Sequence, residues 1–108
     1  MFNTRIKTKI EVKNFMDLIK KCGEEQIECT DHTFFHFSRE QRKTYNESFV
    51  KNILLKETPF LVGIQFNNNH ALFHDYKDKV LKMIIHINHK KIHIITFYFI
   101  QKWQIPKI

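Results

Sequence analysis

Hydrophobic positions recur at helical spacing in the first half of the chain. Residues 11–22 carry one apolar stripe, and Gly23 after it is a natural helix stop. A second helix is expected after Thr30-Asp31, because either side chain can cap its start. A third helix is expected to begin at Asn46 and to end before Pro59.

The period changes after Pro59. Four β-rich runs follow, separated by short polar turns. Turns this short join antiparallel neighbours, so the pattern predicts a four-stranded antiparallel β-meander. The last run is apolar on both faces, which predicts a central or doubly covered strand. The expected runs are residues 60–66, 71–76, 80–87 and 92–100.

These patterns predict a single α+β domain. Two to three N-terminal helices would pack on one face of the meander, because so apolar a sheet needs a cover in water. A chain of 108 residues is long enough for one domain and too short for two. The expected parts are an N-terminal arm (1–10), a helical half (11–58), an antiparallel sheet (59–100) and a basic tail (101–108).

The charge of the chain indicates a class of partner. Lys and Arg number 18 and Asp and Glu number 11, which gives a formal net charge of +7. A field of that sign attracts polyanions and speeds their encounter. RNA is the partner we expect, and an acidic antitoxin-like protein is the second class. A basic surface kept for solubility explains the same composition.

The cysteines and the apolar runs indicate a compartment. Cys22 and Cys29 form no CxxC pair and no disulfide framework, which is typical of a reducing environment. The apolar runs are too short to cross a bilayer, and residues 1–14 lack the apolar core of a secretory signal. We therefore expect a cytoplasmic protein without membrane contact. An exposed edge strand such as residues 60–66 would allow a homodimer.

The expected second helix carries the first candidate chemistry. His32 and His36 are four positions apart and would share one helix face, which Arg39 and Lys43 continue and Arg42 flanks. An imidazole can act as base or acid and cations hold a phosphate, which is what metal-free RNA cleavage needs. A surface helix of mixed polar residues explains the same pattern without catalysis. The pair has no evident third ligand, so we expect no metal or other cofactor.

Polar residues also interrupt the last two expected strands. Lys82 and His86 share one face of residues 80–87, and Thr96 and Tyr98 share one face of the next strand. A two-residue loop with regular pairing puts the two pairs on opposite faces, whereas a one-residue bulge brings them to the same face. The sequence leaves both registers open. Buried, hydrogen-bonded Thr96 and Tyr98 are the interpretation without catalysis.

The basic tail carries one tryptophan. Trp103 can stack on a nucleobase, with Lys102 beside it as a phosphate contact. The tail can equally fold back and bury the indole, which is the outcome we favour.

The order of these features resembles the RelE/barnase/colicin D-type ribonuclease toxins, and most of all small BrnT-like domains with a His-Ala-x-x-Arg-like helix. The matching segments are DHTFFHFSREQRKTYNESFVKNIL, HALFHDY, VLKMIIHI and KIHIITFYF, which together extend from residue 31 to residue 99.

The resemblance implies a metal-independent endoribonuclease that cleaves RNA by His-assisted attack of the 2′-OH. His32 or His36 would be the catalytic histidine, and Thr96 and Tyr98 the late-strand polar pair. The alternatives are a nucleic-acid-binding module without catalysis and an interaction protein that binds an acidic partner. The expected phosphate contacts are Arg39, Arg42, Lys43, Lys82, His86 and Lys102.

Overall fold

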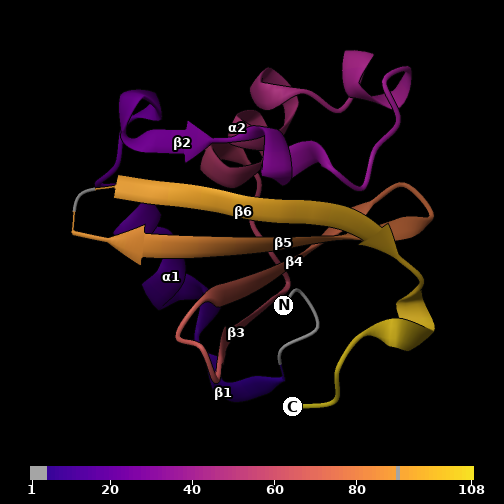
Figure 1. The fold of residues 1–108 in the computed structure, drawn as a ribbon. Coiled ribbons are helices and arrows are strands. Elements are labelled where there is room, and N and C mark those ends of the chain that lie inside the picture. Colours follow the sequence, from indigo (N-terminus) through magenta and orange to yellow (C-terminus); the bar gives the residue numbers. More distant parts are fainter. Residues whose placement is uncertain (1–4, 90) are drawn as a thin grey trace.

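The computed structural model describes residues 5–89 and 91–108. Within them, a six-stranded sheet of order β1-β3-β4-β5-β6-β2 carries two α-helices on one face (Figure 1). The helices are α1 (Val12–Ile19) and α2 (Glu47–Lys56). The strands are β1 (Ile6–Ile10), β2 (Ile27–Cys29), β3 (Leu61–Gln65), β4 (His70–Tyr76), β5 (Lys79–Asn88) and β6 (Lys91–Ile100).

The prediction of a four-stranded meander under two to three N-terminal helices is wrong, because the sheet has six strands and only two of the three expected helices form in the described residues. Its four runs are present as β3 to β6, each antiparallel to the next. However, β1 pairs antiparallel with β3, and β2 pairs parallel with β6. The overall class is still α+β, and β6 is confirmed as an interior strand. Because β3 lies between β1 and β4, residues 60–66 are not the exposed edge that we expected for a homodimer.

The predicted second helix does not form. Residues Asp31–Phe34 and Gln41–Lys43 form short 3₁₀ turns instead. The Thr33 hydroxyl donates a 2.6 Å hydrogen bond to the carbonyl of Ile94 in β6. The ring of Phe37 lies 4.9 Å from that of Phe97, between centroids. These contacts follow directly after the parallel pairing of β2 with β6. The segment is therefore held by side-chain contacts with β6, and not by the hydrogen bonds of a regular α-helix.

The first and third helices are confirmed, with one corrected end. Helix α1 ends at Ile19, and Gly23 is not a left-handed stop because its φ is −96°. Helix α2 begins as predicted, with Asn46 as its N-cap. The Asn46 side-chain oxygen accepts a 3.0 Å hydrogen bond from the backbone N–H of Phe49.

Replacing Asn46 with alanine is expected to lower the free energy of unfolding by about 1 kcal/mol. The change leaves an N–H of the first turn without its side-chain acceptor, and it also removes the 3.0 Å bond from the Asn46 amide to the Lys43 carbonyl. Urea unfolding of both proteins measures the difference. Asn52→Ala, at an exposed position inside α2, is the matched control and should not destabilise the protein. Equal stability of Asn46→Ala and the wild type would contradict the role of the cap.

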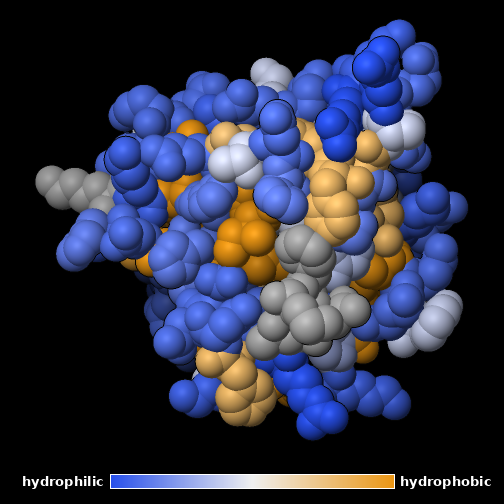
Figure 2. Space-filling view, viewed as in Figure 1, coloured by the Kyte–Doolittle hydropathy of each residue, from blue (hydrophilic) through white to orange (hydrophobic). Residues whose placement is uncertain are grey.

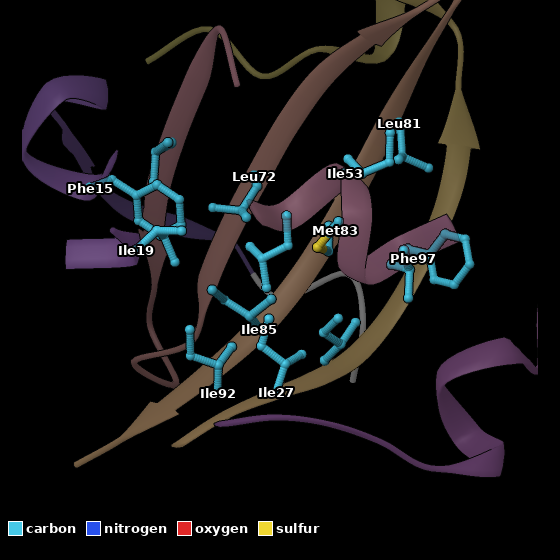
Figure 3. Packing of buried hydrophobic residues seen from close by; sticks show 14 of the residues in the cluster. Phe15, Ile19, Ile27, Ile53, Leu72, Leu81, Met83, Ile85, Ile92 and Phe97 are labelled. Atoms are coloured by element: carbon cyan, nitrogen blue, oxygen red, sulfur yellow. The ribbon is translucent and has the colours of Figure 1, made fainter. Parts of the chain in front are cut away.

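The main core lies between the two helices and one face of the sheet, here called the helix-covered face. Figure 3 shows Phe15 and Ile19 of α1 and Ile53 of α2 pointing at the buried side chains of the strands. The strand residues of this cluster are Val62, Leu72, Leu81, Met83, Ile85, Ile92, Ile94 and Phe97. None of the helices in the described ranges is long and apolar enough to cross a membrane.

The opposite side of the sheet, here called the second face, has its own smaller cluster. Ile105 of the C-terminal tail and Ile6 of β1 pack against it. The methyl of Ile6 lies where a side chain at Gly63 would project, so only glycine leaves room at that position. The cluster consists of Leu61, Ala71, Phe73, Val80, Ile84 and Ile100. The candidate chemistry lies on this second face.

Candidate functional site

A register shift between β5 and β6 places the late-strand polar residues on one face. Lys82 is the direct partner of Tyr98, and the pairing shifts by one residue further along, at Ile95 of β6. Thr96 and Tyr98 therefore lie on the same face as Lys82 and His86. Of the two registers that the sequence left open, the bulged one is present.

Three side chains form a row across the second face. Phe73 of β4, Lys82 of β5 and Tyr98 of β6 are successive cross-strand partners. The Lys82 Nζ lies 5.7 Å from the ring centroid of Phe73 and 5.7 Å from that of Tyr98. Both distances are within the range in which a cation is attracted to an aromatic ring.

His36 extends this row beyond the edge of β6. Its ring centroid lies 4.6 Å from that of Tyr98 and 4.1 Å from that of Phe35. We call His36, Tyr98, Lys82 and Phe73 the His36 cluster. It brings together an imidazole from the turns after β2, an ammonium group from β5 and a phenol from β6.

Partial burial shifts the proton equilibria of the His36 cluster. It lowers the pKa of His36 and that of Lys82, because an apolar environment disfavours their cationic forms. It raises the pKa of Tyr98 for the corresponding reason. At neutral pH the site therefore holds an imidazole shifted toward its basic, neutral form and a protonated phenol that can donate a hydrogen bond.

A shallow hollow adjoins this cluster. Thr30, His32, His93 and Ile95 line it, and its volume is about 490 Å³. The Nε2 atom of His93 is buried and has no hydrogen-bond partner within residues 5–89 and 91–108. Figure 2, viewed with the helices behind the sheet, shows apolar surface exposed between hydrophilic side chains on this side of the molecule.

The two predicted histidines lie on one connected line of rings, although no helix holds them. The ring of His32 lies 6.1 Å from that of Phe35, which in turn contacts His36. His32 also lines the hollow, whereas His36 contacts Tyr98. The sequence did not distinguish the two positions.

Two other predicted strand residues lie on the second face without joining the cluster. Thr96 is fully buried, and its hydroxyl lacks a hydrogen-bond partner in the described part of the chain. A molecule bound at the surface would not reach this hydroxyl without movement of its neighbours. The Nδ1 of His86 lies 3.0 Å from the side-chain oxygen of Asn69, which fixes the orientation of this ring.

The basic residues of the predicted second helix do not form a stripe. Arg42 turns inward, and its Nε donates bonds of 3.1 and 3.0 Å to the carbonyls of Phe34 and Phe37. Lys43 forms a 3.2 Å ion pair with Glu40. Arg39 is exposed. Phosphate binding by these three basic residues stays a prediction, and Arg42 also holds the turn that carries His36.

The prediction that the tail buries its tryptophan is wrong. Trp103 is 81% exposed on a 3₁₀ turn (Lys102–Gln104), with Lys102 exposed beside it. An indole presented to solvent in this way favours contact with another molecule.

Sequence reasoning missed some of the residues that complete the site. Phe73 and Ile95 lay within expected strands and Phe35 within the expected second helix, and none of the three was a candidate site residue; in the structure Phe35 is 44% exposed. The register could have identified Phe73, because a direct neighbour of Lys82 on β4 must share its face. Ile95 had no comparable signal, since its place depends on the bulge.

Comparison with known proteins adds no assignment. No family model, curated protein or solved structure matches the chain. Within the described residues no group of three or more His, Cys, Asp or Glu side chains is placed to hold a metal ion.

Proposed function

We propose that the chain is a metal-independent endoribonuclease and that the His36 cluster is its active site. The observation that supports this proposal is the contact between His36 and Tyr98, at 4.6 Å between ring centroids, with the Lys82 ammonium over the same phenol ring. A base, a hydrogen-bond donor and a cation within one cluster meet the needs of RNA cleavage by the 2′-OH.

In the proposed reaction His36 is the base. Its neutral imidazole removes the proton of a ribose 2′-OH, and the 2′-oxygen attacks the adjacent phosphorus. The P–O5′ bond breaks, which leaves a 2′,3′-cyclic phosphate and a 5′-hydroxyl that takes its proton from solvent. The Lys82 ammonium and the Tyr98 hydroxyl stabilise the charge that builds on the phosphoryl oxygens. His36 then returns its proton to solvent.

The charge of the chain supports an RNA substrate. The formal net charge of +7 attracts a polyanion. Beside Lys82 and Tyr98, the exposed rings of His36 and Phe35 provide faces on which bases stack. Lys102 and Trp103 extend this combination of cation and ring to the tail.

RNA binding without cleavage is the second candidate function. It is favoured by the position of the His36 ring between Phe35 and Tyr98, an arrangement that resembles a stacking platform. In that case the protein would bind RNA with a steep dependence on salt and leave the strand intact. The experiment that follows separates the two functions.

Incubation of the pure protein with tRNA or mRNA in the presence of EDTA should give fragments that end in a 2′,3′-cyclic phosphate. Tyr98→Phe keeps the ring and removes only the hydroxyl, so it should slow cleavage about 10- to 100-fold, the effect of losing one hydrogen bond to a charged group. Cleavage rates come from end-labelled RNA separated on gels. Phe99→Tyr, which adds a hydroxyl at a half-buried position of the helix-covered face, is a control expected to retain activity if it folds.

The results separate the candidate functions. If the protein binds RNA and the RNA stays intact, the result supports RNA binding without cleavage and rejects the nuclease. Cleavage at the wild-type rate by Tyr98→Phe would remove the phenol from the mechanism. Cleavage that EDTA abolishes would reject the metal-independent reaction.

A further inference from the structure

We propose that the hollow lined by Thr30, His32, His93 and Ile95 binds one purine base of the RNA chain. This proposal rests on the proposed function and adds a base preference to it. The hollow would hold a purine next to the phosphodiester that the His36 cluster cleaves.

The size and chemistry of the hollow fit a nucleobase. Its volume of about 490 Å³ falls within the range of roughly 300–1,000 Å³ that is usual for small-ligand pockets. Ile95 provides an apolar contact, and the exposed ring of His32 provides a flat one. A purine gains more than a pyrimidine from such walls, because its larger ring system removes more apolar area from water.

The wall of the hollow also carries an imidazole from β6. The Nε2 of His93 is buried there and lacks a hydrogen-bond partner in the described chain. Because that atom is buried, a base in the hollow would contact the apolar wall and not this nitrogen. The preference for a purine therefore rests on the apolar area that the base covers.

The position of the hollow suits a nucleotide bound next to the cleavage site. Ile95 and Tyr98 are three residues apart on β6, which corresponds to about 7–10 Å along a bulged strand. His32 connects to His36 through Phe35 by ring contacts of 6.1 and 4.1 Å. A base in the hollow would therefore leave the neighbouring phosphate within reach of Lys82.

The test uses uridine 12-mers of RNA that contain one central adenosine or guanosine, with cleavage at every bond resolved on a gel. The wild type should cut a bond flanking the purine about tenfold or more faster than the U–U bonds of the same molecule. Thr30→Trp, at an exposed position on the rim, would fill the hollow and should cut all bonds at about the U–U rate. Asn52→Trp, on the exposed side of α2, adds the same bulk elsewhere and should keep the purine preference.

A second measurement keeps the hollow testable if no RNA is cut. The affinity of the same oligonucleotides is then compared by fluorescence anisotropy. Purine-dependent binding that Thr30→Trp removes would support the base site although the nuclease proposal fails. Cleavage or binding with no purine preference, a preference for uridine, or a preference that survives Thr30→Trp would each overturn the base site. Of these results, cleavage without a purine preference would overturn the base site and still support the nuclease proposal.

Discussion

Replacement of His36 with alanine is expected to slow RNA cleavage by about 10²–10⁴-fold, the usual contribution of a general base. In the proposed mechanism the imidazole removes the 2′-OH proton, and the methyl group of alanine cannot accept it. The structural cost should be small, because His36 is exposed and the turn is held by other contacts, among them the bond from Thr33 to Ile94. RNA affinity should change far less than the cleavage rate.

The pH dependence of the wild type gives a second measure of the same group. The base acts only when it is neutral, so kcat/KM should rise with pH through the pKa of His36 in the free enzyme. Burial lowers that pKa, so the rise should be centred below about 6.5, the ordinary value for histidine. Rates measured between pH 4 and 8 on a short RNA test this. A rise centred above the ordinary histidine value would contradict the assignment.

Two matched variants show whether the effect is specific to His36. His89→Asn removes an exposed histidine from a position with a φ of 54°, which asparagine tolerates, and should cleave like the wild type. His32→Ala should keep the chemical step and alter base preference, since His32 lines the hollow. A large loss in His32→Ala together with full activity in His36→Ala would exchange the proposed roles of the two histidines.

The sequence predicted which residues belong to the site better than it predicted the strand register that brings them together. The alternation around Lys82 and His86 predicted that both lie on one face, and the observed pairing of Asn88 with Lys91 agrees with a two-residue loop in the last hairpin. Residue 90 itself lies outside the described residues. Whether Tyr98 joined that face depended on a bulge of one residue, and a bulge has no dependable sequence signal. The bulge depends on how the two faces of β6 pack against the rest of the protein.

The two missed strands have different explanations. In β1, isoleucine and threonine alternate with Lys7 and Lys9, so its period-two pattern was visible in the supposed N-terminal arm. In β2, only residues 27–29 pair, and the partner is β6, more than sixty positions further along the chain. So short a parallel strand depends on its neighbour for its conformation, and local sequence cannot predict it.

The supposed second helix shows how a spacing argument can fail while its residues remain relevant. His32 and His36 share a face on an ideal helix, but this segment consists of turns anchored by Thr33 and Phe37. The His36 contact with Tyr98 arises from this anchoring. A three-residue strand followed by turns can therefore bring an imidazole to the sheet edge as well as a helix can.

Acidification from pH 7 to pH 4 is expected to remove about 3 kcal/mol of stability through one buried histidine, His74. Its side chain is 3% exposed on β4, and it pairs with Leu81 on the helix-covered face. Burial lowers the pKa of His74 to about 4, although the backbone of Glu57 opposes the shift. Against an unfolded value of about 6.5, the difference is about 2.5 pKa units, each equivalent to about 1.4 kcal/mol.

The direction follows from which state binds the proton. Above pH 6.5 His74 is neutral in both states, so its full contribution to stability is present. Between about pH 6.5 and 4, His74 is protonated in the unfolded chain and neutral in the folded chain. The free energy of unfolding therefore decreases as the pH is lowered, until the pKa of the folded state is reached. His70 adds to this trend, because burial against Phe15 also lowers its pKa.

Urea unfolding at pH 7 and pH 4 measures this loss. His74→Leu replaces the imidazole with a side chain that has no charged form, so the difference in unfolding free energy between the two pH values should shrink by about 3 kcal/mol. His89→Asn, which removes an exposed histidine, should leave the difference unchanged. The comparison between pH values cancels any loss of packing that the leucine causes at both. If His74→Leu and the wild type lose the same stability on acidification, the acid sensitivity of the fold comes from other groups, and His74 is protonated in the folded state without cost.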